Sequence, residues 1–114
     1  MKKAIRVYSG PDGESHFEEI EIPFGEKMGP NMLSLPMAAK DVFFIENSGE
    51  HESGWHRAPC RQMIAVTAGE LEIEVGSGEK RRLGPDDILM AEDTTGRGHL
   101  TRTRNRKAIV VRFV

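Results

Sequence analysis

His56 and His99 are the residues of this chain that could most readily do chemistry. His56 lies at the start of a long apolar run, GWHRAPCRQMIAVTAGELEIEV over residues 54–75, and Cys60 and Gln62 follow it closely. An imidazole can bind a divalent metal, and it titrates near neutral pH, so it can also exchange a proton with a substrate. His56 could therefore be a metal ligand, an acid–base catalyst, or a histidine that only hydrogen bonds a neighbouring group.

Alternation of apolar and polar residues dominates the chain and predicts strands rather than helices. Turn-forming clusters such as SGPDGES, TAGE, GSGE and LGPDD separate the apolar runs. The expected strands cover residues 3–9, 15–22, 41–47, 60–67, 70–76, 79–83, 87–91 and 108–113. Residues 25–40 contain two prolines and no clean period, so we expect an irregular segment there with at most one helical turn. Many short strands at close spacing indicate an all-β sandwich or barrel.

Neighbouring residues of a strand point to opposite faces, so parity predicts which side chains enter the interior. Three sets are expected to point inward: His56, Ala58, Cys60, Gln62, Ile64 and Val66; Leu71, Ile73 and Val75; and His99, Thr101, Thr103, Ile109, Val111 and Phe113. His56 and His99 are thus predicted to face the interior. Arg102, Arg104 and Arg106 fall on the outer face, where the glutamates between residues 70 and 74 can oppose them across strands.

Two segments resemble the two conserved motifs of the cupins, which are small β-barrels of the jelly-roll type. The first motif is histidine, any residue, histidine, three or four residues, glutamate, six residues, glycine, and the corresponding positions here are His56, Ala58, Gln62 and Gly69. The second motif has a proline–glycine–aspartate turn, a short strand and a histidine. Its counterpart is GPDDILMAEDTTGRGH, which ends at His99.

The resemblance covers roughly residues 40–114 and implies an all-β fold, a single cupin-like jelly-roll β-barrel with little helix. We therefore expect one domain over residues 1–114. Within it, residues 1–24 would supply N-terminal strands, residues 25–40 the irregular segment and residues 41–114 the core barrel.

In cupins the motif histidines and glutamate typically bind a divalent metal inside the barrel. Carried over to this chain, that metal site would consist of His56, Gln62 and His99, because Ala58 stands where a second histidine is usual and Gln62 where the glutamate is. A glutamine oxygen can bind iron, manganese, nickel or zinc, but it brings no negative charge, so the affinity for the metal should fall.

Two classes of function stay open. The first is a divalent-metal enzyme of dioxygenase, isomerase or lyase type, with the metal on the three residues just named. The second is a metal-free protein that binds or senses a small ligand, or that uses His56 or His99 as an acid–base catalyst. A third reading, a structural dimer without chemistry, is also open, because the fold does not determine the function.

Four residues around the histidines are candidate ligand-binding residues: Trp55, Cys60, Gln62 and Thr101. Cys60 could be a nucleophile, although a free cysteine is more often a small buried apolar residue. Gln62 could equally bridge backbone groups between strands. In the polar loop EDTTGRGHLTR over residues 92–102, Asp93 is expected to cap a turn by accepting from nearby amides.

Composition limits the partners of the chain. With 16 basic and 18 acidic residues the net charge is −2, which argues against nucleic acid or a membrane surface as a partner. A single cysteine cannot form an internal disulfide, and no run has the length of a signal peptide or a membrane span, so we expect a cytoplasmic protein. The expected partner is a small-molecule ligand. The resemblance adds a homodimer, because small cupins commonly pair through N-terminal strands.

Overall fold

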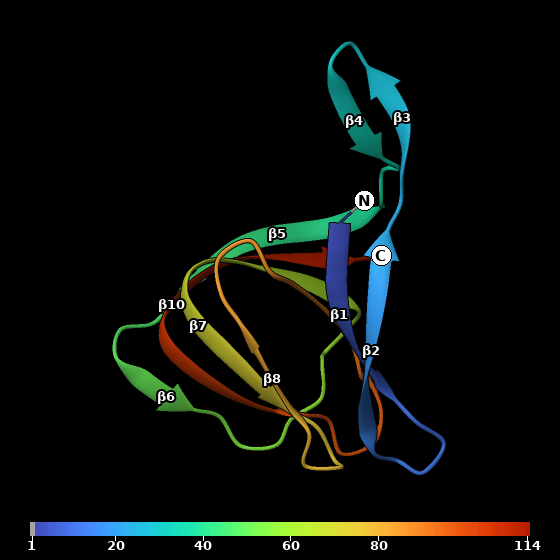
Figure 1. The fold of residues 1–114 in the computed structure, drawn as a ribbon. Coiled ribbons are helices and arrows are strands. Elements are labelled where there is room, and N and C mark those ends of the chain that lie inside the picture. Colours follow the sequence, from blue (N-terminus) through green and yellow to red (C-terminus); the bar gives the residue numbers. More distant parts are fainter. Residues whose placement is uncertain (1) are drawn as a thin grey trace.

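Two long strands, β7 (Gln62–Glu74) and β10 (Leu100–Phe113), pair antiparallel along most of their length and organise the fold (Figure 1). The computed structural model describes residues 2–114, and every regular element among these residues is a strand. The other strands are β1 (Lys2–Ser9), β2 (Ser15–Ile22), β3 (Phe24–Met28), β4 (Asn31–Ser34), β5 (Ala39–Glu46), β6 (Glu50–Glu52), β8 (Lys80–Leu83) and β9 (Ile88–Glu92). The prediction of an all-β chain is confirmed.

The main sheet folds over into two layers. The larger layer has the strand order β2-β1-β9-β7-β10-β5, in which β9 pairs with the first residues of β7 and β5 with the last residues of β10. The other halves of β7 and β10 form the smaller layer, with β8 beside β7 and β6 beside β10. This arrangement is the expected jelly-roll barrel.

An apolar interior lies between the two layers and includes residues from both. Its buried members are Val7, Ala58, Val66, Leu71, Ile73, Val75, Leu83, Leu89 and Ala91. The inward orientation predicted for residues 71, 73 and 75 is confirmed, since all three side chains are fully buried. Burial of each larger apolar side chain contributes about 1.5–3 kcal/mol, so this cluster is the main source of stability.

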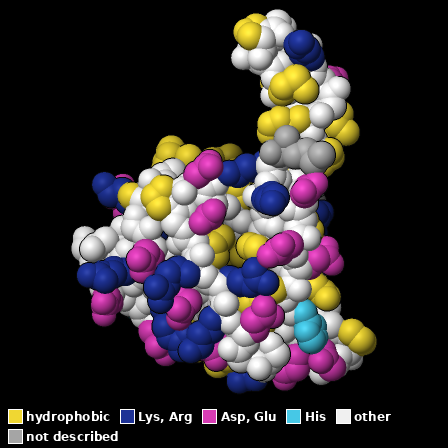
Figure 2. All heavy atoms as spheres, viewed as in Figure 1, with side chains coloured by type: hydrophobic (Ala, Val, Ile, Leu, Met, Phe, Trp, Pro, Cys, Tyr) yellow, Lys and Arg dark blue, Asp and Glu magenta, His cyan; other side chains and the backbone are white. Residues whose placement is uncertain are grey.

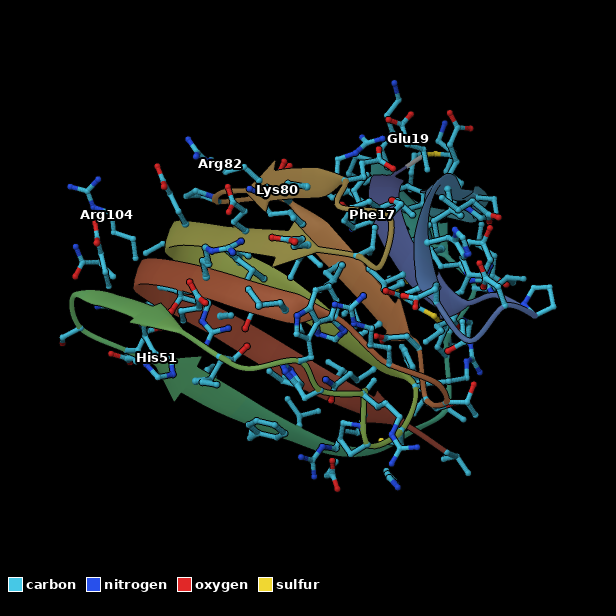
Figure 3. All side chains as sticks on the ribbon, turned by 90° about the horizontal axis from the view of Figure 1, so that it is seen from below. Phe17, Glu19, His51, Lys80, Arg82 and Arg104 are labelled. Carbon is cyan, nitrogen blue, oxygen red and sulfur yellow. The ribbon has the colours of Figure 1, made fainter. Side chains whose placement is uncertain are left out.

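The outer face of the smaller layer carries paired charges. Arg102 Nη1 lies 2.9 Å from a Glu74 carboxylate oxygen and 3.2 Å from one of Glu72, as the opposing parities predicted. Arg104 projects away from the sheet into solvent (Figure 3). Arg106 departs from the expected outer row, because it is half-buried and this burial lowers its pKa.

β7 and β10 bend together at Gly69 and Asn105. Gly69 has a φ of 72°, and a Cβ there would lie 2.1 Å from the Asn105 carbonyl oxygen, so only glycine lets the strands approach this closely. Asn105 also has a positive φ, 47°, and the pairing register of β10 shifts between Arg104 and Lys107. The TAGE sequence, expected to be a turn between two strands, is therefore a bend within one continuous strand.

The register irregularity in β10 between Arg104 and Ala108, called the bulge below, goes with a reversal of side-chain parity in both long strands. Thr103 lies opposite Leu71 and Val110 lies opposite Ile64, and both partners belong to the apolar interior. Without a bulge, residues 103 and 110 would face opposite sides, because an odd number of positions separates them. The irregularity between them therefore returns the second half of β10 to the interior on the other parity.

The residues after the bulge accordingly face the side opposite to the one expected. The prediction that Ile109, Val111 and Phe113 point inward is wrong, and Ala108 and Val110 point inward instead. Val111 and Phe113 belong to a second apolar cluster on the outer face of the larger layer. The other members of this outer cluster are Ala4, Ile20, Ile22, Met63, Ile88 and Met90.

Residues 24–34 form a hairpin, β3–β4, that projects from the rest of the molecule (Figure 1). We expected residues 25–40 to be irregular with at most a helical turn, and this part of the domain division is corrected. Gly29, with a φ of 60°, starts the tight turn between the two strands and lets Pro30 follow it.

Residues 2–114 contain no helix that is long and apolar enough to cross a membrane. The expected cytoplasmic location stays a prediction.

Replacement of Gly69 by alanine should destabilise the protein strongly. The added Cβ meets the backbone of β10 and the residue must also keep a positive φ, so we expect the free energy of unfolding to fall by on the order of 2–4 kcal/mol in urea denaturation. Gly78→Ala is the matched control, because Gly78 has a φ of 90° but open space around its Cβ position. It should cost about 1 kcal/mol. Equal losses for the two variants would contradict the close-approach argument.

Candidate functional site

A backbone bridge holds His56 beside His99. The His56 N–H donates to the His99 carbonyl oxygen at 3.0 Å, and the His99 N–H donates to the His56 carbonyl oxygen at 2.8 Å. Gly98 makes this bridge possible, since it has a φ of 81° and a Cβ there would lie 2.0 Å from the His56 carbonyl oxygen. The two imidazole rings consequently lie with centroids 4.6 Å apart. The structure thus brings together the two residues that the sequence analysis placed first.

His99 is buried, and Asp93 holds its ring. The His99 Nδ1–H donates to Asp93 Oδ2 at 2.5 Å, which leaves Nε2 as the nitrogen with a free lone pair. Asp93 is fully buried, and its second oxygen, Oδ1, has no hydrogen-bond partner in the described part of the chain. We expected Asp93 to cap the loop, and this is wrong. Asp93 has the same strand parity as Leu89 and Ala91, which point inward from β9. This parity was the sequence signal that could have predicted that Asp93 is buried.

His56 is exposed at the mouth of the barrel, so the expectation that it points into the interior is not met. Parity fails here because residues 53–61 form a loop and not a strand. The His56 Nδ1–H donates to the Gly54 carbonyl oxygen at 2.9 Å, which again leaves Nε2 free. Ser53 lies between this ring and the half-buried Thr101, with its hydroxyl 2.7 Å from the Thr101 hydroxyl.

An open depression of about 680 Å³ adjoins His56. It is lined by Trp55, His56, Arg57, Ala58, Pro59, Thr94, Gly96 and Arg97. The Arg97 guanidinium stacks on the Trp55 ring at 3.9 Å from its centroid and also lies 3.4 Å from a Glu14 carboxylate oxygen. Arg57 is exposed and forms no ion pair within residues 2–114. No carboxylate is among these lining residues, and two of them, Arg57 and Arg97, are positively charged.

Gln62 and Cys60 lie further along the same segment. Gln62 is half-buried and lies in register with Ala91, two residues before Asp93, so it points inward near the buried pair. The ring nitrogens of the two histidines hydrogen bond to Asp93 and Gly54 and not to Gln62. Cys60 is a free, half-buried cysteine. The ligand-binding roles of Trp55, Cys60, Gln62 and Thr101 stay predictions.

The donor set meets part of what a divalent metal needs. Metal-binding histidines usually donate their second ring N–H to a carboxylate or a carbonyl, as His99 and His56 do here. Within residues 2–114, however, no three His, Cys, Asp or Glu side chains cluster so that they could hold a metal ion. Two imidazoles alone are one protein ligand short of a typical catalytic site. The metal trio of His56, Gln62 and His99 stays a prediction.

Glu92 anchors the end of β9, immediately before Asp93. Arg6 Nε and Arg61 Nε both donate to its carboxylate, the latter at 2.6 Å. Burial raises the pKa of Glu92, but the hydrogen bonds and charges of the two arginines outweigh burial and leave its pKa below the ordinary value. The carboxylate therefore ties β9 to β1 and to the loop that carries His56.

Comparisons with known proteins give a partial sequence match and several structural neighbours. A Neurospora crassa protein named cupin-domain-containing oxidoreductase srdB is 41% identical over 54 residues. The match covers 47% of this chain and 25% of the relative, so the chain spans about a quarter of the length of the curated protein that it matches. No protein-family profile matches the chain.

The structural neighbours extend over more of the chain. A Salmonella typhimurium protein described as ethanolamine utilization protein Q aligns with a TM-score of 0.50 and 12% identity, over 99% of this chain and 96% of the other. A Streptococcus pyogenes protein of unknown function aligns with a TM-score of 0.48 and 15% identity, over 71% of this chain and 70% of the other. The alignment with the Salmonella typhimurium structure supports the fold of this chain and nothing further.

Removal of the Asp93 carboxylate should destabilise the protein through His99. Asp93→Ala leaves a buried imidazole N–H without an acceptor, so we expect a loss of about 2–3 kcal/mol in the free energy of unfolding at pH 7. Asp93→Asn keeps an acceptor oxygen in nearly the same shape and should cost about 1 kcal/mol. If denaturation shows the same loss for both variants, the hydrogen bond to His99 is not what Asp93 contributes.

Glu92→Gln should lower stability at neutral pH and much less in acid. Because the folded-state pKa of Glu92 is depressed, its ionised form stabilises the fold above the ordinary glutamate pKa, and this contribution disappears as the pH falls through the folded-state pKa. We expect a loss of about 1 kcal/mol at pH 7 that shrinks below pH ~4 in denaturation measured as a function of pH. Glu79→Gln is the control and should have little effect at any pH, because it removes an exposed carboxylate that within residues 2–114 pairs with Arg81 alone.

Proposed function

We propose that this chain, which is a member of the cupin superfamily, binds a small carboxylate-bearing molecule beside His56 and transfers protons to and from it. One observation carries the proposal. The exposed His56, with Nε2 free, lines a depression that also contains two arginines, and the buried His99–Asp93 pair holds it from behind.

The arginines support an anionic ligand. The guanidinium of Arg57 has no carboxylate partner in the described structure and can form two parallel hydrogen bonds with a carboxylate. Arg97 also lines the depression and adds positive charge, although Glu14 offsets part of it. The Trp55 ring, one face of which Arg97 covers, adds apolar surface to the lining of the depression.

The ring of His56 supports proton transfer. Its Nδ1–H is engaged by the Gly54 carbonyl, a tautomer assigned from this hydrogen-bond partner, so that Nε2 faces away with its lone pair. An imidazole can remove a proton from a ligand and return it to another atom of the ligand. Reactions of this kind are isomerisations, or eliminations of the lyase type when a group leaves after the proton is removed.

His99 and Asp93 act as positioning residues in this proposal. His99 is 4% exposed and does not line the depression, so it does not contact the ligand directly. Its backbone fixes the His56 backbone, and its ring packs against the His56 ring. Asp93 in turn fixes the His99 ring through Nδ1. The catalytic residue is His56, and Arg57 is the primary ligand-binding residue.

Binding can be tested by nuclear magnetic resonance with benzoate as the probe. We expect saturable shifts of the backbone amides of residues 55–58 and 94–97, with a millimolar dissociation constant that rises at least fivefold in Arg57→Gln, because the bidentate contact is lost. Arg104→Gln, on the outer face of the smaller layer, is the matched control and should bind as the wild type does. Shifts that do not saturate, or that Arg57→Gln leaves unchanged, would contradict the proposal.

Proton transfer is measured separately, as deuterium incorporation from D2O into 2-oxo carboxylic acids. The His56→Gln substitution should slow this incorporation by about 100-fold or more.

A divalent-metal enzyme is the second candidate, and a specific observation favours it. Both histidines engage Nδ1 with an oxygen acceptor, which leaves both Nε2 atoms free for a metal, with Gln62 as the third ligand. A bound metal would supply Lewis-acid or oxygen-activating chemistry. Elemental analysis of the untagged protein and of a His56→Ala/His99→Ala double variant decides between the candidates. Near-stoichiometric metal that the double variant lacks would favour the metal enzyme, and wild-type protein that takes up no added iron, manganese, nickel or zinc would exclude it.

A further inference from the structure

Glu14, which directly precedes β2, reaches the wall of the depression beside His56. Its Oε2 lies 3.4 Å from Arg97 Nη1, and within residues 2–114 neither of these side chains makes another ion pair. The Arg97 guanidinium also stacks on the Trp55 ring, 3.9 Å from its centroid. Arg97 is therefore held between an aromatic face and a carboxylate that come from two other segments of the chain.

The turn that ends at Glu14 is fastened to the loop that carries Arg97. The Arg97 N–H donates to the Gly13 carbonyl oxygen at 3.0 Å. The Ser9 hydroxyl donates to the Thr95 carbonyl oxygen at 2.8 Å. The turn between β1 and β2 and the loop between β9 and β10 accordingly lie at the same end of the barrel (Figure 1). The ion pair thus joins two backbone segments that are already fixed against each other.

Gly76, in the turn between β7 and β8, makes room for the Glu14 side chain. A Cβ at this position would lie 1.9 Å from Glu14 Oε2 and 2.9 Å from the Glu14 Cβ. Gly76 does not have a positive φ, so the space that Glu14 occupies is what favours glycine here. The Gly76 N–H donates to the Ser15 hydroxyl oxygen at 3.2 Å, which holds the two segments together. Packing therefore sets the position of the Glu14 carboxylate.

Glu14 lowers the positive charge that a ligand meets in the depression. Arg57 and Arg97 both line it, and the Glu14 carboxylate pairs with the second of them. The chain as a whole has a net charge of −2, and acidic and basic side chains are interspersed over the face shown in Figure 2. No broad positive field is thus added on that face, and distant exposed charges are screened by salt. The local groups decide which ligand charge fits.

We propose that Glu14 is a specificity-determining residue that restricts the site to ligands with a single carboxylate. The inference rests on the proposed function, since it takes Arg57 as the group that binds this carboxylate. A second carboxylate that reached Arg97 would have to share the guanidinium with Glu14, and two like charges on one group repel each other. The ligand class is therefore a monocarboxylic acid and not a dicarboxylic acid.

Titration with two ligands that share one aromatic body tests this inference. Benzoate has one carboxylate and isophthalate has two, and all of them are ionised at pH 7. For the wild type we expect dissociation constants that agree within about twofold, because the second carboxylate gains no partner. In Glu14→Gln the ratio of the two constants should shift by about fivefold or more in favour of isophthalate, because Arg97 becomes free to bind the second carboxylate.

Two further variants separate the position of the carboxylate from the change in total charge. Glu18→Gln removes the same charge from a glutamate of β2 that pairs with Arg6, so it should leave the ratio unchanged. Gly76→Ala keeps the total charge but displaces the Glu14 carboxylate, so it should shift the ratio in the same direction as Glu14→Gln does.

The outcomes distinguish this inference from the proposed function. An unchanged ratio in Glu14→Gln, in a protein that still binds benzoate through Arg57, would overturn the inference and leave the proposed function standing. Wild-type protein that does not bind benzoate would overturn both.

A second measurement on the wild type needs no variant to fold. The Nε–H signals of the arginine side chains are followed in ¹⁵N-labelled protein during both titrations. We expect both ligands to shift the Arg57 signal and to leave the Arg97 signal nearly in place, because Glu14 engages Arg97. If isophthalate shifts the Arg97 signal as strongly as the Arg57 signal, the second carboxylate binds despite Glu14 and the inference is wrong.

Discussion

The pairing of β7 with β10, bent at Gly69, is the constraint on which the rest of the structure depends. A straight pair of strands of this length would give one flat sheet with two exposed faces. Because Gly69 has no Cβ, the Asn105 carbonyl can approach it, and the two strands turn together so that their halves face each other across the apolar interior. His99 directly precedes the start of β10 and bridges to His56, which is exposed at the mouth of the barrel.

The candidate site is built from three segments that meet at that mouth. His99 immediately precedes β10, Asp93 immediately follows β9, and His56 lies in the loop before β7. A buried carboxylate with one unpartnered oxygen costs stability, and two apolar side chains of similar size would fill the space without that cost. The local stability of the fold therefore gives no reason for an aspartate at this position. Its reason is the orientation of His99 and, through the backbone bridge, of His56.

Much of the fold follows from local patterns, and the errors arise where tertiary structure interrupts them. The alternation over residues 70–76 predicts strands, and the resemblance of His56, Gly69 and His99 to the cupin motifs implies a barrel in which the two histidines lie together. Parity is reliable only along an uninterrupted strand, so it failed for Ile109, which follows the bulge, and for His56, which lies in a loop. The bulge depends on the approach of Gly69 to Asn105, two residues from different strands, and no local pattern contains it. Asp93 was wrongly predicted to cap a turn, because it begins a polar loop. Its parity, which continues that of the inward-facing residues of β9, was given less weight.

The donor atoms around His56 allow either a bound divalent metal or proton transfer on an anionic ligand, and the surrounding charges favour the second. A divalent cation bound by two imidazoles and a neutral glutamine would receive no negative charge from its ligands, and the Arg57 and Arg97 side chains beside the depression would repel it. The Asp93 carboxylate offsets part of this charge, but it is already engaged with His99. An anionic ligand meets the opposite conditions, because the same two arginines attract it and His56 needs only its free Nε2 to exchange a proton. The charges that disfavour a resident metal are therefore the ones that favour proton transfer on a small anion.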